Sequence, residues 1–104
     1  MLNVLVTGSN GQLGSEIREL SPEYNYNFFF TDRNTLDISD KKAVEEFLSR
    51  NDINIIINCA AYTAVDTAES DEANADKINH LAVKNLAELA KDKNIQLIHI
   101  STDY

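Results

Sequence analysis

The stretch "LNVLVTGSNGQLGSEI" (residues 2–17) decides the fold that this sequence predicts. It opens with a short apolar run over residues 2–7, which predicts a buried strand. All three glycines of the chain follow at a strict three-residue interval, as Gly8, Gly11 and Gly14. Residues without a Cβ let a backbone turn tightly and pack closely against its neighbours. The strand is therefore expected to run directly into a tight loop.

A helix is predicted over residues 12–20, because apolar side chains recur there at helical spacing and a Ser-Pro pair follows. The next apolar segment, 26–32, predicts a second strand that ends on Asp32. A strand, a glycine loop, a helix and a second strand with an acidic end are typical of dinucleotide-binding units. This part of the chain therefore indicates such a unit.

The rest of the chain continues to alternate helix and strand without any hairpin signal between the strands. Parallel strands joined by right-handed crossover helices are the simplest arrangement of such a pattern. The sequence therefore predicts an α/β fold with three layers, a Rossmann-type doubly wound parallel sheet of four strands in the order 3-2-1-4. The further elements expected are a helix within 37–51, a strand over 53–58, a helix within 78–94 and a strand over 95–101. The first of these helices places Ala43, Val44, Phe47 and Leu48 on one face, and the second has an apolar stripe of Ile78, Leu81, Ala82, Leu86, Leu89 and Ala90.

Length, charge and composition limit the classes of function. The 104 residues are expected to form one domain, 1–104, and the net charge of −8 argues against binding to nucleic acid. No apolar run is long enough to cross a membrane, and no signal peptide is recognisable. A lone cysteine, Cys59, suits a cytoplasmic location. His99 alternates within the last predicted strand and is expected to pack in the core. His80 and His99 lack further metal ligands at suitable spacing, so no metal site is expected.

Because the chain carries a net charge of −8, any phosphate group that it binds must be held by local geometry. The backbone N–H groups and the positive end of the helix that follows the glycine loop attract phosphates without any lysine. The carboxylate of Asp32 can accept hydrogen bonds from an adenosine ribose. The alternative is that the glycines only form a tight turn and that Asp32 only caps a loop. The complete strand, loop, helix and acid arrangement favours cofactor binding.

Four segments carry a resemblance to a known family. "TGSNGQLG" (7–14) resembles the TGxxGxxG loop of the extended short-chain dehydrogenases/reductases. "NCAAYTAVDTAE" (58–69) and "STDY" (101–104) are similar to segments of the dTDP-4-dehydrorhamnose reductases within that superfamily, and "LDISD" (36–40) fits the same order. The resemblance implies an NADH- or NADPH-dependent oxidoreductase that reduces dTDP-4-dehydro-L-rhamnose to dTDP-L-rhamnose, in the synthesis of cell-wall polysaccharides and lipopolysaccharides.

The resemblance also implies roles for individual residues. Thr102 matches the catalytic threonine, and Tyr104 is expected in the substrate pocket. Asp37 and Ile38 match a pair that borders the adenine ring. The full set of implied cofactor contacts is Gly8, Asn10, Gly11, Gln12, Leu13, Gly14, Asp32, Arg33, Asp37, Ile38, Ala60, Ala61 and Tyr62.

The choice between NADH and NADPH depends on two neighbouring charges. Asp32 repels a 2′-phosphate, whereas Arg33 can neutralise one. We expect both cofactors to bind, with NADH somewhat favoured.

One catalytic feature of the family is missing from these 104 residues. In the YxxxK pair of the family, the lysine holds the nicotinamide ribose and the tyrosine protonates the sugar oxygen. None of the four tyrosines of this chain has a lysine four positions later. We therefore expect an amino-terminal fragment that lacks the substrate domain and does not turn over by itself. The strand over 95–101 would then leave an unpaired apolar edge through which the fragment self-associates.

Two other functions remain open at this point. The parent protein can be a related NAD-dependent sugar-nucleotide epimerase or dehydratase. It can also be a non-catalytic regulatory subunit built on the same fold.

Overall fold

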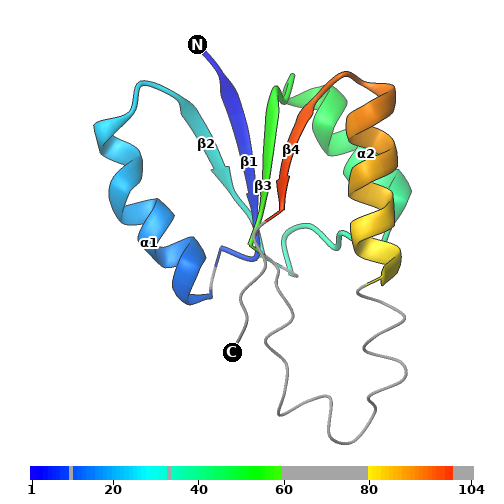
Figure 1. Ribbon diagram of the computed structural model, residues 1–104, viewed down its shortest axis with the longest axis horizontal. Coiled ribbons are helices and arrows are strands. Elements are labelled where there is room, and N and C mark those ends of the chain that lie inside the picture. Colours follow the sequence, from blue (N-terminus) through cyan, green and yellow to red (C-terminus); the bar gives the residue numbers. More distant parts are fainter. Residues whose placement is uncertain (10, 33, 60–79, 100–104) are drawn as a thin grey trace, which may run out of the picture.

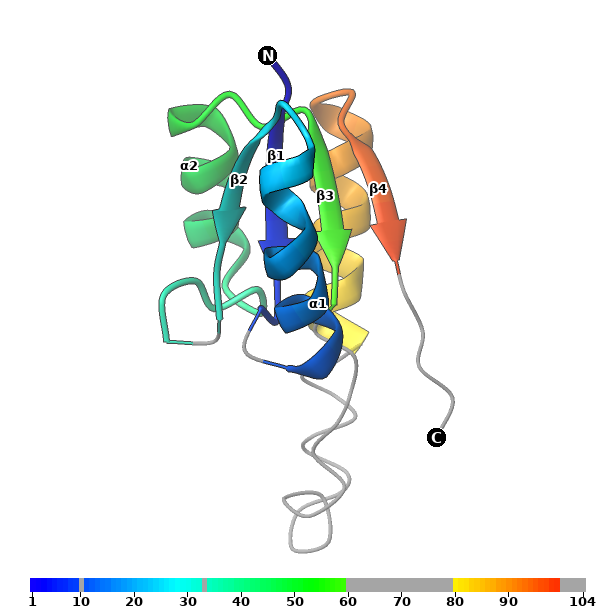
Figure 2. The ribbon, with the colours of Figure 1, turned by 90° about the vertical axis from the view of Figure 1, so that its left-hand side faces the viewer.

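The computed structural model describes residues 1–9, 11–32, 34–59 and 80–99. The four strands form one parallel sheet, with α1 on one face and α2 and the helix over 80–92 on the other (Figures 1 and 2). The predicted α/β fold with helices on both faces of a parallel sheet is therefore confirmed. In chain order the elements are β1 (Asn3–Thr7), α1 (Gln12–Leu20), the short 3₁₀ helix η1 (Ser21–Glu23), β2 (Asn27–Phe30), α2 (Lys41–Arg50), β3 (Ile55–Asn58), the helix over 80–92, and β4 (Gln96–His99).

The predicted strand order 3-2-1-4 is wrong: the sheet has the order β2-β1-β3-β4. β3 pairs with β1, so the chain crosses over β1 after it leaves β2. A right-handed crossover that reverses direction places its helix on the opposite face of the sheet. This reversal lets α2 cover the face that α1 leaves open. Two crossovers in the same direction would have placed both helices on one face.

Apolar packing on both faces of β1 fits its place between two other strands. Val4 and Val6 point toward α1 and form a buried cluster with Cys59. Leu5 points the other way, into a larger cluster with residues of α2 and of the helix over 80–92. The side chains of Val4, Leu5 and Val6 are all 2% exposed or less. A strand buried on both faces needs a paired strand on each side and helices on both faces.

The helices follow the predicted apolar patterns with one exception. On α2, Val44 and Leu48 are buried, as expected from their helical spacing. On the helix over 80–92, Ala82, Leu86, Leu89 and Ala90 are buried but Leu81, which the pattern assigned to the same stripe, is 47% exposed. Asn85 takes a place on the buried face instead, at 3% exposure. Among the described residues, no helix is long and apolar enough to cross a membrane.

The register of this helix can be tested with a matched pair of substitutions. Leu86→Ala should lower the free energy of unfolding by about 2–5 kcal/mol, because it leaves a cavity in the larger core cluster. Leu81→Ala, the same change on the exposed side of the same helix, should lower it by less than about 0.5 kcal/mol. Urea unfolding followed by circular dichroism measures both. Equal losses would show that the helix is rotated from the orientation described.

Candidate functional site

The glycine loop lies at the point where the strand order reverses. The loop after β1 leads to α1 and then to β2 on one side, while β3 lies on the other side of β1. The strands all point to one edge of the sheet, and α1 begins there (Figure 1). Open α/β sheets bind ligands at this position, outside the carboxyl ends of the strands. The fold therefore places the glycine loop where a ligand site is expected.

Each of the three glycines has a different environment. Gly8 has a φ of 68°, a conformation that side-chain-bearing residues rarely adopt. A Cβ on Gly14 would lie 2.5 Å from the Cα of Ser9, so only glycine allows α1 to pack this closely on the loop. A Cβ on Gly11 would have its nearest neighbour, the Gly8 carbonyl oxygen, at an ordinary 3.5 Å. Gly8 and Gly14 are thus required by the loop itself, whereas a Cβ on Gly11 would make only an ordinary van der Waals contact.

The amino terminus of α1 retains donors that the described side chains do not cap. Gly11 is the N-cap residue, and the first helical hydrogen bond runs from the N–H of Ser15 to the Gly11 carbonyl at 2.9 Å. The N–H groups of residues 12–14 come before that bond. By contrast, α2 is capped by Asp40, whose Oδ1 accepts from the N–H of Ala43 at 3.3 Å. Uncapped N–H groups at the positive end of a helix form a ready anion site.

Hydrogen bonds attach the glycine loop to the end of β2. The N–H of Ser9 donates to the Thr31 carbonyl at 2.9 Å. The Thr31 hydroxyl and N–H both donate to the Val6 carbonyl, at 3.0 and 2.9 Å. The guanidinium of Arg18 lies 4.6 Å from the centre of the Phe30 ring and donates to the Ser9 hydroxyl at 3.4 Å. These contacts bring the loop beside Asp32, the acidic residue that the sequence singled out.

The Asp32 carboxylate is held in place by the turn that follows it. Its Oδ1 accepts hydrogen bonds from the N–H groups of Asn34 and Thr35, at 2.9 and 3.0 Å, and from the Thr35 hydroxyl at 3.2 Å. The bond from the Thr35 N–H is the largest of the effects that hold the pKa of Asp32 below its ordinary value. Among the described residues, these bonds all fall on Oδ1, which leaves Oδ2 for a ligand hydroxyl. The Asp32 carboxylate therefore caps the turn that follows it, and the hydrogen bonds of that turn fix the orientation of the carboxylate.

The loop before α2 has a similar internal support. The Oδ1 of Asp37 accepts from the Ser39 hydroxyl at 2.6 Å and from the Ser39 N–H at 3.0 Å. The side chain of Ile38 is half-buried and packs on the larger core cluster. The pair implied to border adenine thus belongs to an ordered turn, anchored by Ile38 and displaying Asp37 at the surface.

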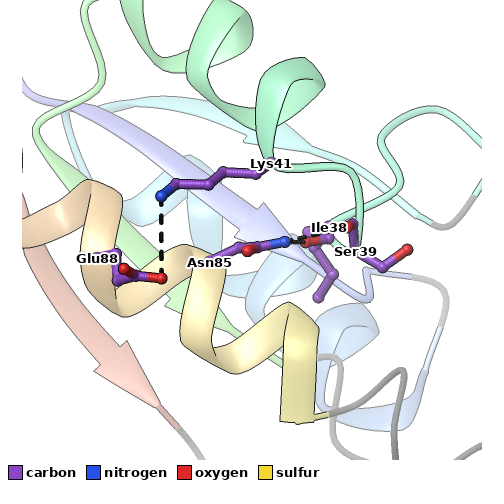
Figure 3. A network of polar contacts seen from close by, with 5 residues as sticks. All are labelled: Ile38, Ser39, Lys41, Asn85 and Glu88. Carbon is purple, nitrogen blue, oxygen red and sulfur yellow. Dashed lines mark hydrogen bonds and ion pairs between the residues drawn. The ribbon is translucent and has the colours of Figure 1, made fainter.

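Asn85 is a residue of this region that the sequence reasoning missed. It lies on the buried face of the helix over 80–92, and its Nδ2 donates to the carbonyls of Ile38 and Ser39 at 3.2 and 3.0 Å (Figure 3). The available signal was a polar side chain at the core spacing of Ala82, Leu86 and Leu89. A buried amide at such a position requires hydrogen-bonding partners. The sequence does not show that these partners lie in the loop before α2.

The last rung of the sheet is a row of polar side chains across three strands. Thr7, Asn58 and His99 are paired in register on β1, β3 and β4. The Thr7 hydroxyl donates to Asn58 Oδ1 at 2.6 Å, and Asn58 Nδ2 lies 2.9 Å from His99 Nδ1. Because an amide nitrogen only donates, His99 accepts at Nδ1. Its alternating position in the strand suggested a packed core residue, but the imidazole is exposed.

The remaining predicted contacts either lie at the start of α1 or fall outside the described residues. The side chain of Leu13 packs on the Val4 and Val6 cluster, so its contribution at the loop comes from its backbone. Gln12 is the first residue of α1 and brings its N–H to the same place. Among the described residues, no group of three or more His, Cys, Asp or Glu side chains is placed to hold a metal ion. The predicted contacts that lie outside the described residues are Asn10, Arg33, Ala60, Ala61, Tyr62, Thr102 and Tyr104.

Comparison with known proteins agrees with this arrangement. The family model described as "RmlD substrate binding domain" matches residues 2–104. The chain belongs to this family. A relative in Aggregatibacter actinomycetemcomitans, named dTDP-4-dehydrorhamnose reductase, is 39% identical over 100% of this chain, which covers 36% of that protein.

Two solved structures in the same group are similar in both sequence and fold. The crystal structure of a dTDP-4-dehydrorhamnose reductase from Clostridium acetobutylicum has a TM-score of 0.87 and 43% identity, over 99% of this chain and 37% of that one. The dTDP-4-dehydrorhamnose reductase from Bacillus anthracis, solved in complex with NADP, has a TM-score of 0.85 and 39% identity, over 100% of this chain and 37% of that one. The chain thus spans 36–37% of the length of these relatives. These likenesses identify the sheet as Rossmann-type.

The different environments of Gly11 and Gly14 predict different effects when each is replaced by alanine. Gly14→Ala should lower the free energy of unfolding by about 1–3 kcal/mol, because the new methyl group meets the Ser9 backbone. Gly11→Ala has ordinary backbone angles and room for a methyl group, so it should change stability by less than about 0.5 kcal/mol. It should nevertheless weaken the binding of pyrophosphate-containing ligands by about tenfold, because the methyl group occupies the anion's approach. Urea unfolding and titration calorimetry separate the two effects. A Gly11→Ala variant with unchanged ligand affinity would contradict the site.

Proposed function

We propose that this chain is the NAD(P)H-binding portion of a dTDP-4-dehydrorhamnose reductase. The observation that carries the proposal is the amino terminus of α1, whose N-cap residue Gly11 has no side chain and makes no side-chain cap. The residues present suit a dinucleotide, because a diphosphate needs backbone donors without an obstructing Cβ. The family membership of the chain, and the NADP named in the Bacillus anthracis structure, support this choice of ligand.

Within this proposal each element of the site binds a different part of the cofactor. The N–H groups of residues 12–14 bind the diphosphate, and Asp32 accepts hydrogen bonds from the adenosine ribose through Oδ2. Asp37 and Ile38 border the adenine, with the carboxylate facing the exocyclic amine and the aliphatic chain facing the ring. NADH or NADPH, when bound, supplies the hydride that reduces the 4-keto carbon of the dTDP-sugar. The chain's own contribution is to bind and orient the cofactor.

The catalytic step is proposed for a longer parent protein. Thr102 is the catalytic threonine of the proposal and would hydrogen-bond the sugar oxygen, with Tyr104 in the substrate pocket. Because the 104 residues contain no YxxxK pair, we expect this chain alone to bind cofactor without reducing a dTDP-sugar. The alternative of a non-catalytic subunit would be favoured if the parent protein also lacks this pair. Product analysis on the parent protein separates the reductase from an epimerase or dehydratase.

The chemistry of Cys59 supports the expected cytoplasmic location. Its thiol is buried, and burial raises its pKa. A buried thiol with a raised pKa is mostly protonated and therefore unreactive at neutral pH. A single cysteine of this kind suits a reducing compartment, where disulfides do not form.

Titration calorimetry with NADH and NADPH tests the proposed function. We expect both to bind, with NADH somewhat tighter, because the Asp32 carboxylate repels a 2′-phosphate. Asp32→Asn should improve the affinity for NADPH relative to NADH by about fivefold, since it removes that charge. Glu45→Gln, which removes one negative charge from the exposed side of α2, is the control and should leave the ratio unchanged. Failure of a folded chain to bind either cofactor would refute the proposal.

We also propose that the chain self-associates through the strand over 95–101. Among the described strands, β4 pairs only with β3, so its other edge has open backbone groups. Ile98 on β4 is 40% exposed. It lines an apolar cavity of about 270 Å³ on the α1 face, together with Ile17, Leu20 and Ile57. An open strand edge beside exposed apolar surface is a template for pairing with a second copy.

Sedimentation velocity over a range of concentrations tests this association. The wild-type chain should form dimers as its concentration rises, whereas Ile98→Lys should remain monomeric, because a lysine on an edge strand opposes pairing. Glu45→Gln changes the net charge by the same amount at a distant site and should dimerise like the wild type. A wild-type chain that stays monomeric at millimolar concentration would disprove the association.

A further inference from the structure

We propose that Asn85 is a positioning residue for adenine recognition: its buried side-chain amide holds the loop that carries Asp37 and Ile38. The inference rests on the proposed function, because it assigns Asn85 to the adenine end of the same site. Asn85 acts through the loop and makes no contact with the cofactor itself.

The hydrogen bonds of Asn85 reach two consecutive backbone carbonyls in another part of the chain. Its Nδ2 donates to Ile38 at 3.2 Å and to Ser39 at 3.0 Å, across sequence separations of 47 and 46 residues. Figure 3 shows the amide pointing from the helix into this loop. An amide nitrogen has two hydrogens, so both donors of the side chain are used on the loop. The orientations of the two peptide groups are therefore fixed by one side chain.

These two peptide groups join Ile38 to Ser39 and Ser39 to Asp40, and the first contains the Ser39 N–H that donates to the Asp37 carboxylate. Leu36, on the other side of Asp37, is buried in the larger core cluster. Asp40 caps α2 and donates its own N–H to the Asp37 carbonyl at 3.0 Å. The segment from 37 to 39 is thus a short span between two fixed points, and Asn85 holds its middle. Without that support, the Ser39 groups that bind the Asp37 carboxylate can shift, and the carboxylate shifts with them.

The cost of placing an asparagine at this position argues for such a role. Asn85 is 3% exposed and lies between Ala82, Leu86 and Leu89 on the buried face of its helix. Leucine has a higher helix propensity than asparagine, and burying an amide is unfavourable unless it is hydrogen-bonded. A leucine would suit the helix and the core but would leave both loop carbonyls without a donor. The benefit of asparagine therefore lies in the loop.

A neighbouring contact on the same helices supplies the control. Lys41 on α2 and Glu88 on the helix over 80–92 approach to 3.9 Å, with side chains that are 47% and 46% exposed (Figure 3). Such an exposed pair adds little to stability. It links the helix that carries Asn85 to α2 without touching the carbonyls of Ile38 or Ser39. Glu88→Gln thus perturbs the helix contact and leaves the loop supported.

The test compares NADPH with its hypoxanthine analogue, in which a carbonyl oxygen replaces the exocyclic amine of adenine. Calorimetry on the wild-type chain should show about tenfold tighter binding of the adenine form, because Asp37 accepts from the amine. Asn85→Leu should reduce this preference to less than about twofold, and Glu88→Gln should retain it. A purely structural role would weaken both ligands equally and keep the ratio. Retention of the wild-type ratio in a folded Asn85→Leu variant would overturn the proposal.

Two further measurements keep the result decisive. If Asn85→Leu fails to fold, Asn85→Ala provides the same loss of donors with a smaller change in volume. Amide hydrogen exchange on the ligand-free chain should be about tenfold faster at Ser39 and Asp40 in either variant and unchanged in Glu88→Gln. Unchanged exchange at both amides would also overturn the proposal. A wild-type chain that binds neither dinucleotide overturns the proposed function, whereas binding without adenine preference overturns only the adenine role.

Discussion

The architecture depends on the fact that β1 is buried on both faces. Val4 and Val6 fill one apolar cluster and Leu5 the other, so this strand has no side to expose to water. A strand of this kind must have neighbours in the sheet on both sides and helices above and below it. The chain meets this requirement by pairing β2 with one side of β1 and β3 with the other. The chain reverses its direction across the sheet after β2, and the glycine loop follows β1 at this point, outside the carboxyl ends of the strands.

The candidate site combines uncapped N–H donors at the start of α1 with two carboxylate acceptors that are already hydrogen-bonded within the chain. The amino terminus of α1 has no capping side chain among the described residues, whereas α2 is capped by its own Asp40. The two acidic residues of the site, Asp32 and Asp37, each accept hydrogen bonds from the turn that follows them. These bonds restrict the carboxylates before any ligand arrives. Such preorganisation reduces the ordering cost of binding.

The sequence was sufficient to predict the elements and the place of the glycine loop between β1 and α1, but insufficient to predict the contacts between distant segments. Periodicity and the glycine spacing are local properties, and the strands, helices and loop that they predicted are present. The order of the strands was wrong because pairing of β3 with β1 depends on which face remains uncovered, which no local pattern records. Leu81, which was expected on the apolar stripe of its helix, is exposed for a similar reason, and Asn85 lies on the buried face. The partners of Asn85 lie more than forty residues away, in a loop that has no sequence signal for them.

The polar row formed by Thr7, Asn58 and His99 has a consequence for the alignment of the sheet. The amide of Asn58 is directional, with its oxygen toward Thr7 and its nitrogen toward His99. A slip of one residue in either neighbouring strand would turn that strand's side chain to the opposite face and separate it from Asn58. The apolar residue pairs elsewhere in these strands distinguish less well between registers, because isoleucine, leucine and valine pack against one another in similar ways. One asparagine thus favours a single register for three strands, at the end of the sheet that carries the loops of the candidate site.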